Sequence, residues 1–330
     1  MVCQTIQKIY EEKIRLGRLT LFKYLKQYQW SDIKQMLSNN RAKQLQCDVS
    51  LKGKCCVITG ATSGVGWEAA KALADYEASI VMINRNHEKS KKACDKIRSA
   101  YQVECDYLIA NFTHLEEVHK IADHLNHSKR KIDILINNAG VYCTKKTYTE
   151  DHLETTFCVN HLASFILTYK LIDKLKKNTP SRIIQVNSQG HRFNGLNIKD
   201  LNWEKRFYFG LLGYGASKTA QLLTMWKFAD MLKDSGVTIN AMHPGAVKSG
   251  IGENNGSLYR WYKHNCVDRF LGNPSISGKA IHYLATAPEL SGVSGKYFNL
   301  THIEKPSPHA LDRSIGKEIW AISKDLTGLV

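Results

Sequence analysis

A short apolar run that leads directly into a glycine-rich turn constrains the fold of this chain most strongly. The run Cys55 to Thr59 suits a strand, and the segment Gly60-Ala61-Thr62-Ser63-Gly64-Val65-Gly66 comes directly after it and opens a helical pattern. Glycines at such a turn let the backbone approach a pyrophosphate, which the free N–H groups and the dipole of the helix N-terminus favour. Any tight turn between a strand and a helix can also require glycine, but this turn opens the first of several β–α units. We therefore expect a dinucleotide site here.

From Leu51 onward, short apolar runs alternate with amphipathic stretches. The predicted strands are residues 55–59, 80–83, 105–109, 132–136, 182–186 and 238–242, and the predicted helices are residues 67–74, 87–100, 113–125, 151–176 and 214–234. Alternation at this spacing is typical of a parallel sheet with helices on both faces. The sequence therefore predicts an α/β fold, a Rossmann-type doubly wound parallel sheet that binds its ligand at the carboxyl edge of the strands.

Residues 1–50 differ from the rest of the chain, because they are polar, basic and helical in pattern. An interrupted apolar stripe runs through them: Leu19, Leu21, Phe22, Leu25, Tyr28 and Trp30. Packing against the chain's own domain or against a second copy in a homo-oligomer explains such a stripe, and so does an amphipathic helix on a membrane surface. Charged residues interrupt every apolar run near the N-terminus, so we expect neither a signal peptide nor a membrane span there. We predict a helical N-terminal extension, residues 1–50, and a single domain, residues 51–330.

The net charge of +16 is compatible with a nucleic acid, an anionic membrane surface or an anionic cofactor. Much of this charge lies on helical patterns such as 89–96 and 170–177, without a motif that reads nucleic acid, so we predict solvated faces and no nucleic-acid partner. The nine cysteines show no CxxC and no Cys/His ligand spacing. This pattern favours free thiols in a reducing compartment, hence a cytoplasmic protein without a structural metal, in which a peripheral membrane contact through residues 1–50 remains open.

Two further strand ends carry residues suited to a nucleotide. At the end of the second strand, Arg85 stands where an acidic residue would hold the ribose 2′-hydroxyl of NAD, and its guanidinium can pair with a 2′-phosphate. This favours NADP, although a surface charge that begins the next helix is the alternative. After the fourth strand, Asn137-Asn138-Ala139-Gly140 offers small side chains beside the adenosine and ribose.

The acid/base chemistry is indicated by Tyr214 and Lys218, whose spacing on a helix places both side chains on one face. A phenol titrates near ~10 in water, and a neighbouring ammonium together with a positive nicotinamide is expected to lower the pKa of Tyr214. Upstream, the strand Ile183 to Val186 leads to Ser188, whose hydroxyl can bind a substrate oxygen. Tyr-x-x-x-Lys alone is common, but Ser188 at the end of the preceding strand makes it specific.

With these motifs, residues 52 to about 300 resemble the short-chain dehydrogenase/reductase family. The resemblance implies that Ser188 positions the carbonyl, that Tyr214 is the general acid/base, and that Lys218 lowers the tyrosine pKa and binds the nicotinamide ribose. It also implies that Asn160 holds a water in the proton relay. Further segments resemble the retinol dehydrogenase-like branch: Asn160-His161-Leu162, His243-Pro244-Gly245, 294–298 and the C-terminal 319–329.

In that branch, Pro244, Gly245, Val247 and Ser249 lie along the nicotinamide, and the segment 250–273 forms a substrate lid. Here the lid contains the apolar or aromatic residues Leu258, Tyr259, Trp261, Tyr262 and Phe270, although such a stripe is also typical of core packing. This sequence departs from the branch at Asn111-Phe112, where Asp-Leu is usual beside the adenine, at Trp67, where a basic residue is common, and in its charged N-terminus.

We therefore predict an NADP(H)-dependent oxidoreductase that interconverts a small apolar carbonyl compound, retinoid-like or lipid-like, and its alcohol. The alternative is a catalytically idle NADP-binding regulator or scaffold. The predicted catalytic residues are Ser188, Tyr214, Lys218 and Asn160, of which Ser188 and Tyr214 also bind substrate. The predicted cofactor residues are Gly60, Thr62, Ser63, Gly64, Val65, Gly66, Arg85, Asn111, Asn138, Ala139, Gly140, Tyr214, Lys218, Pro244, Gly245, Val247 and Ser249.

Overall fold

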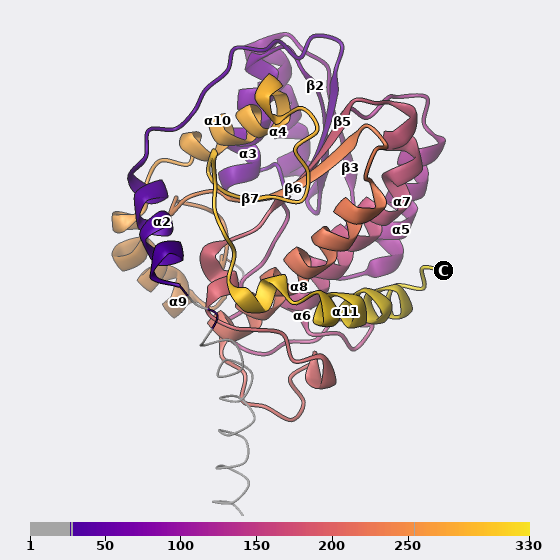
Figure 1. Ribbon diagram of the computed structural model, residues 1–330. Helices are drawn as coiled ribbons and strands as arrows, with labels where there is room; N and C mark the ends of the chain where they lie inside the picture. The colour runs from indigo at the N-terminus through magenta and orange to yellow at the C-terminus, as the bar shows by residue number, and fades with distance from the viewer. Residues whose placement is uncertain (1–26, 28, 254) are drawn as a thin grey trace, which may run out of the picture.

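A twisted sheet with the strand order β3-β2-β1-β4-β5-β6-β7-β8 forms the centre of the computed structural model, which describes residues 27, 29–253 and 255–330 (Figure 1). Neighbouring strands are parallel except at the β7–β8 edge. The strands are β1 Cys55–Thr59, β2 Ser79–Asn84, β3 Cys105–Ile109, β4 Ile134–Asn137, β5 Ser181–Val186, β6 Val237–His243, β7 Tyr297–Asn299 and β8 His302–Ile303. The strand order reverses between β1 and β4, which confirms the predicted doubly wound sheet and places its crevice at their carboxyl ends.

Helices cover both faces of the sheet (Figure 1). One layer contains α3 Gly64–Asp75, α4 His87–Tyr101 and α10 Ser275–Thr286. The other contains α5 Leu115–His127, α7 Ala163–Lys177 and α8 Gly210–Met231, with α11 Arg313–Leu326 packed on α8. The burial of β1 and β4 along their whole length results from this sandwich, since side chains on both faces meet a helical layer.

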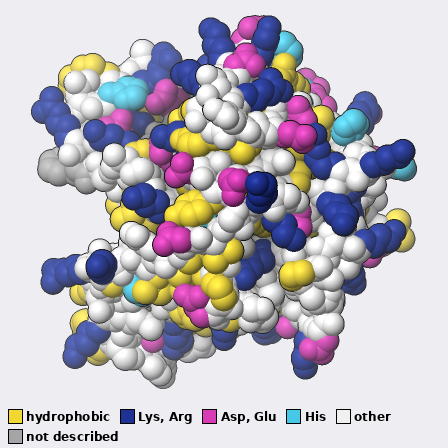
Figure 2. Space-filling model, turned by 90° about the horizontal axis from the view of Figure 1, so that it is seen from above, with side chains coloured by type: hydrophobic (Ala, Val, Ile, Leu, Met, Phe, Trp, Pro, Cys, Tyr) yellow, Lys and Arg dark blue, Asp and Glu magenta, His cyan; other side chains and the backbone are white. Residues whose placement is uncertain are grey.

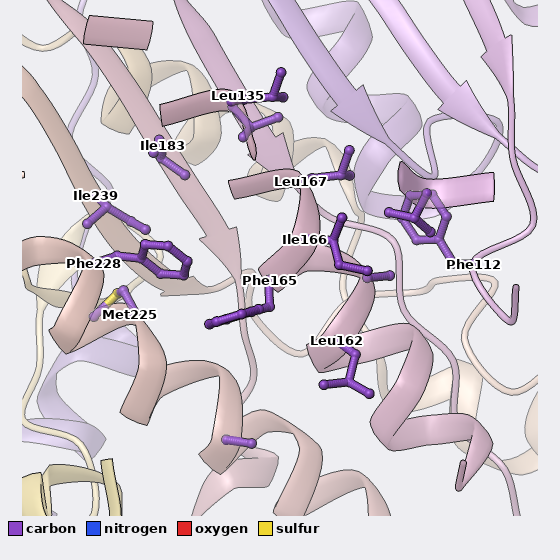
Figure 3. Packing of buried hydrophobic residues seen from close by; sticks show 14 of the residues in the cluster. Phe112, Leu135, Leu162, Phe165, Ile166, Leu167, Ile183, Met225, Phe228 and Ile239 are labelled. Atoms are coloured by element: carbon purple, nitrogen blue, oxygen red, sulfur yellow. The ribbon is translucent and has the colours of Figure 1, made fainter. Parts of the chain in front are cut away.

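The larger part of the core lies between the sheet and α7 and α8. Figure 3 shows Leu135, Ile183 and Ile239 on the strands facing Phe165 and Phe228 on these helices. All of these side chains are buried, so the helix that carries Tyr214 and Lys218 is held firmly against β5 and β6.

The segment expected as one helix over 151–176 is divided, and that prediction was wrong. A short helix α6, Thr155–Phe157, leads into a π-helical turn, Cys158–Leu162, before α7 begins. The helix starts late because the Glu154 carboxylate accepts hydrogen bonds from the backbone N–H groups of Thr156 and Phe157, at 2.9 and 2.7 Å. The π turn contains Asn160, and such turns often occur at functional sites.

In the N-terminal segment, the described structure begins around α2, Trp30–Arg41, which lies beside the β7–β8 edge (Figure 1). Five residues of the predicted apolar stripe, Leu19, Leu21, Phe22, Leu25 and Tyr28, lie outside the described residues. Trp30 is 80% exposed at the start of α2. None of the described helices combines the length and apolarity needed to span a bilayer.

Charged side chains are scattered over the face of the molecule seen from above (Figure 2). Lys and Arg side chains occur all round this face, with Asp and Glu side chains among them. On this face the basic charge is therefore dispersed rather than gathered in one stripe.

Candidate active site

A cavity of about 750 Å³ opens at the carboxyl ends of the parallel strands. Every predicted cofactor residue lines it, from the glycine turn after β1 to Ser249, and so do Ser188, Tyr214 and Lys218. Asn160 is the exception, because it is fully buried and does not reach the cavity wall. The volume is within the usual range for small-molecule sites.

The glycine turn forms one end of the cavity. Gly64 has a φ of +55°, a left-handed conformation that disfavours side chains. A Cβ at Gly66 would collide with the carbonyl oxygen of Gly60 and with the Asn138 amide. That amide donates to the carbonyl oxygens of Thr59 and Gly60, at 2.8 and 3.0 Å. Asn138 thus fixes the turn that presents the N-terminus of α3 to the cavity, a geometry suited to a pyrophosphate.

Asn84, at the end of β2, is a site residue that the sequence reasoning missed. Its Oδ1 accepts a hydrogen bond of 2.7 Å from Ala61 N, whereas its buried Nδ2 has no partner in the described protein. Asn84 also lines the cavity. A buried donor without a partner is costly, so a hydroxyl or phosphate oxygen of a bound dinucleotide fits this position. Its place before Arg85, at a strand end, was the signal that could have identified it.

The residues after β2 form a basic end of the cavity. Arg85 and Lys89 both line it, and Lys89 was not among the predicted residues. Asn86 caps α4, since its side chain accepts from Lys89 N at 2.8 Å. This cap places Lys89 in the first turn of the helix, close to Arg85 along the cavity wall. Two cations at one end suit a phosphate better than a neutral ribose.

Ser188, Tyr214 and Lys218 meet where β5 ends beside α8. Ser188 Oγ and the Tyr214 ring both face Gly190, and a Cβ at that glycine would lie 3.3 Å from Ser188 Oγ. The Tyr214 ring packs so closely on Gly190 that a Cβ there would lie 2.7 Å from its Cε1. Lys218 Nζ donates to the carbonyl oxygen of Val186 at 2.8 Å and lies 5.8 Å from the centre of the Tyr214 ring. The structure thus brings the three residues together, with Lys218 behind the phenol.

Burial dominates the ionisation of this group. It raises the pKa of Tyr214 to about 12, against the weaker lowering effect of the nearby Ser188 side chain. This direction is opposite to the expected lowering, because the cost of burying a phenolate outweighs the effect of the neighbouring groups. Burial also lowers the pKa of Lys218 to about 7. Tyr214 therefore carries its proton at neutral pH, as a proton donor must.

Asn160 links the site to the loop after β4. Its Oδ1 accepts from Val141 N at 2.7 Å, and its Nδ2 donates to Val141 O and Ser217 Oγ, both at 3.0 Å. The π turn leaves Asn160 O to accept from the side chains of Gln221 and Ser164. With these contacts, the Asn160 side chain joins the β4 loop to α8.

The segment expected as a lid, 250–273, contributes Gly250, Ile251, Glu253 and Leu271 to the lining of the cavity. Asn255 attaches it to the β4 loop, because its Oδ1 accepts from Thr144 N and its Nδ2 donates to Tyr142 O, each at 2.8 Å. The ring of Tyr259 lies 5.8 Å from that of Tyr142, which in turn lies 6.0 Å from that of Tyr214. Trp261, by contrast, is 60% exposed. The side chains of Leu258, Tyr262 and Phe270 lie outside what the structure describes.

Comparison with known proteins gives concordant matches. The model of the family described as short chain dehydrogenase matches residues 54–259, which include the glycine turn and the Tyr214–Lys218 pair. Human retinol dehydrogenase 13 is 35% identical over 287 residues, 85% of this chain and 86% of that protein. Human retinol dehydrogenase 11 is 34% identical over 284 residues, 85% of this chain and 88% of that protein. An uncharacterized protein from Mycobacterium paratuberculosis has a similar structure, with a TM-score of 0.68 at 26% identity, over 85% of this chain and 95% of that one.

Proposed function

Because the chain belongs to the short-chain dehydrogenase/reductase family and is similar to retinol dehydrogenases, we propose that it reduces an apolar aldehyde or ketone with NADPH, and catalyses the reverse oxidation. The observation that carries this proposal is the group Ser188, Tyr214 and Lys218 on the wall of one cavity with the glycine turn. We assign the catalytic chemistry to residues 51–330. No observation favours the alternative of an idle regulator.

The preference for NADP is supported by the basic end of the cavity. Arg85 and Lys89 would face the 2′-phosphate, while the N-terminus of α3, Thr62 and Ser63 would face the pyrophosphate. Asn84 supplies its buried Nδ2 as a donor. On the nicotinamide side, the bound cofactor would lie along Pro244, Gly245, Val247 and Ser249 and supply the hydride.

The protein's own part in the reaction is to orient the carbonyl and to move one proton. Ser188 Oγ, which lies next to the Tyr214 ring at Gly190, would donate to the carbonyl oxygen and hold it beside the phenol. Tyr214 would then give its proton to that oxygen as negative charge develops there. Lys218, held by Val186 O, would bind the nicotinamide ribose and, in its protonated form, stabilise the resulting phenolate. Asn160, which does not line the cavity, would serve the proton relay through the loop at Val141.

An apolar substrate is favoured by the rings next to Tyr214. Tyr142 contacts Tyr214 edge-on and Tyr259 of the lid segment packs on Tyr142, so aromatic rings surround the ring of Tyr214 next to the cavity. Aromatic walls with few polar groups are typical of sites for apolar ligands. A panel of aliphatic, aromatic and isoprenoid aldehydes and ketones tests the proposal, with NADPH oxidation as the readout. Activity on sugars but on none of these compounds would contradict the substrate class.

We also propose that α2 contacts an anionic membrane surface. This helix docks through polar residues: Asp32 pairs with Lys305 at 2.9 Å, and Asn39 donates to Ile303 O at 3.2 Å. Its apolar residues face outward, with Trp30, Ile33 and Leu37 80%, 38% and 51% exposed. Lys34, Arg41 and Lys43 are exposed beside them. Outward apolar residues flanked by basic ones are typical of interfacial helices.

A further inference from the structure

A buried carboxylate lies behind the active site and takes no part in the chemistry proposed above. Glu304 comes directly after β8, and its side chain is fully buried. Its Oε1 accepts hydrogen bonds from Gln189 Nε2 at 2.6 Å and from Arg192 Nη2 at 2.7 Å. Its Oε2 accepts from Asn299 Nδ2 at 3.0 Å and from Asn39 Nδ2 at 3.4 Å. A buried charge with this many donors is an organising point for the groups around it.

Two of these donors belong to the turn that comes after the proposed catalytic serine. Gln189 and Arg192 are the first and last residues of a 3-10 turn, Gln189–Arg192, whose N-cap is Ser188. The same turn supports Tyr214, because the ring of Tyr214 packs on Gly190 and a Cβ at Gly215 would meet Gly190 O at 2.8 Å. Glu304 therefore holds both ends of the turn that positions the two hydroxyls.

The opposite side of Glu304 faces the N-terminal segment. Asn299 donates through Nδ2 to Asn40 Oδ1 at 2.7 Å as well as to Glu304. Asn39 reaches the carboxylate itself and Ile303 O. Further along the chain, Gln44 Oε1 accepts from Thr301 N and Thr301 Oγ1, at 3.1 and 2.8 Å. The end of α2 and the segment after it thus complete the polar surroundings of the carboxylate.

We infer that Glu304 is a positioning residue for Ser188 and Tyr214, and that Asn39 and Asn40 complete its site, so that the N-terminal segment is part of the active-site scaffold. The inference rests on the proposed function for its catalytic consequence. The structural consequence, that α2 restrains the turn 189–192, does not depend on the proposed function. Loss of the two asparagine side chains leaves Asn299 and one carboxylate oxygen without these partners, which loosens the turn without changing any group in the cavity.

The test compares the double variant Asn39→Ala/Asn40→Ala with wild type and with a control, Asn178→Ala. Asn178 is also partly buried and hydrogen-bonded, to Lys174 O at 2.9 Å, but it lies at the far end of α7. We expect the double variant to lose roughly tenfold in kcat, with KM for the carbonyl and the Kd of NADPH nearly unchanged, because misplacement of a reacting group acts on the chemical step. We also expect faster amide hydrogen exchange in residues 188–194. Glu304→Gln should show the same changes more strongly. This substitution breaks a buried ion pair and can prevent folding, in which case the asparagine variants alone test the inference.

The two readouts separate this inference from the proposed function. Wild-type protein without any carbonyl reductase activity would refute the function, and exchange in residues 188–194 would still decide whether α2 restrains the turn. Exchange in the double variant equal to that of Asn178→Ala would overturn the inference. So would an unchanged kcat in an active enzyme, or an equal loss of kcat in the control.

Discussion

Lys218 Nζ donates a hydrogen bond of 2.8 Å to the carbonyl oxygen of Val186, which joins the middle of α8 to the last residue of β5. Ser188 lies just beyond that strand end, and Tyr214 lies one helical turn before Lys218. The contact therefore holds the helix that carries Tyr214 against the strand end that leads to Ser188. It also keeps a buried amino group paired with a carbonyl dipole rather than with a carboxylate.

This environment predicts a pH dependence of stability. Burial lowers the pKa of Lys218 to about 7 in the folded protein, from 10.5 for an ordinary lysine. Between these values the unfolded chain binds the proton and the folded protein does not, so this group makes stability rise with pH, by ~1.4 kcal/mol per unit. We expect the difference in free energy of unfolding, wild type minus Lys218→Met, to grow from pH 7 to pH 10. Denaturant unfolding at several pH values measures it, and a constant difference would show that Lys218 is charged in the folded protein.

We expect cofactor preference to depend on the basic end of the cavity. A charge-assisted hydrogen bond contributes about 1.5 to 3 kcal/mol, so Arg85 should make NADPH bind roughly ten- to a hundredfold more tightly than NADH. Arg85→Asp should abolish or invert this ratio, and Lys89→Ala should reduce it. Lys92→Ala is the control, because Lys92 is exposed on the same helix and does not line the cavity. Titration of both reduced cofactors gives the ratios. Equal affinities of the wild-type protein for NADPH and NADH would contradict a role of Arg85 in cofactor preference.

The glycine turn is expected to tolerate no side chain at Gly66. An alanine there would push its Cβ into Gly60 O and the Asn138 amide, both part of the turn. We expect Gly66→Ala to weaken NADPH binding at least tenfold, and the overpacking to cost about 1 to 3 kcal/mol of stability. Gly256→Ala, where no atom lies within 4 Å of the added carbon, should change neither. Calorimetric binding and thermal unfolding distinguish the two variants.

Much of this site can be predicted from local sequence signals. The turn after β1 and the pair on α8 are motifs of fixed spacing, and strand ends must gather at one edge of a parallel sheet. These signals predict that Arg85 belongs to the cofactor site, and in the structure Arg85 lines the cavity. The position of Lys89 depends on the cap made by Asn86, which spacing alone does not identify.

Other features depend on contacts between distant segments, which periodicity does not report. β7 and β8 are too short for an alternating pattern, and they exist because residues 297–303 add to the edge of β6. Glu304 resembles any other surface acid until the fold places Arg192 and Asn39 around it. The raised pKa of Tyr214 has the same origin, because it results from burial, and Gly190 and Tyr142, which pack against the ring, come from other segments.

Membrane contact by α2 predicts binding to vesicles of mixed neutral and anionic lipid. Trp30→Asp/Leu37→Asp should reduce co-sedimentation, and high salt should weaken it, because both the apolar stripe and the basic residues contribute. Phe207→Asp is the control, since Phe207 is also 80% exposed but lies elsewhere, in the loop before α8. Binding that the α2 variant leaves unchanged would contradict the proposal. A concentration-dependent dimer abolished by the variant would assign the stripe to a second copy instead.

The most direct test of the central claim is single-turnover oxidation of bound NADPH by an apolar aldehyde, in wild type and in Tyr214→Phe. The phenylalanine ring preserves the packing on Gly190 but removes the proton donor, so we expect the hydride-transfer rate to fall about a hundredfold or more while NADPH still binds. The control Tyr283→Phe should react like wild type, because the Tyr283 hydroxyl donates to Glu289 on the side of the sheet that α10 covers. Retention by Tyr214→Phe of more than about a tenth of the wild-type rate would contradict the assignment of Tyr214 as the general acid.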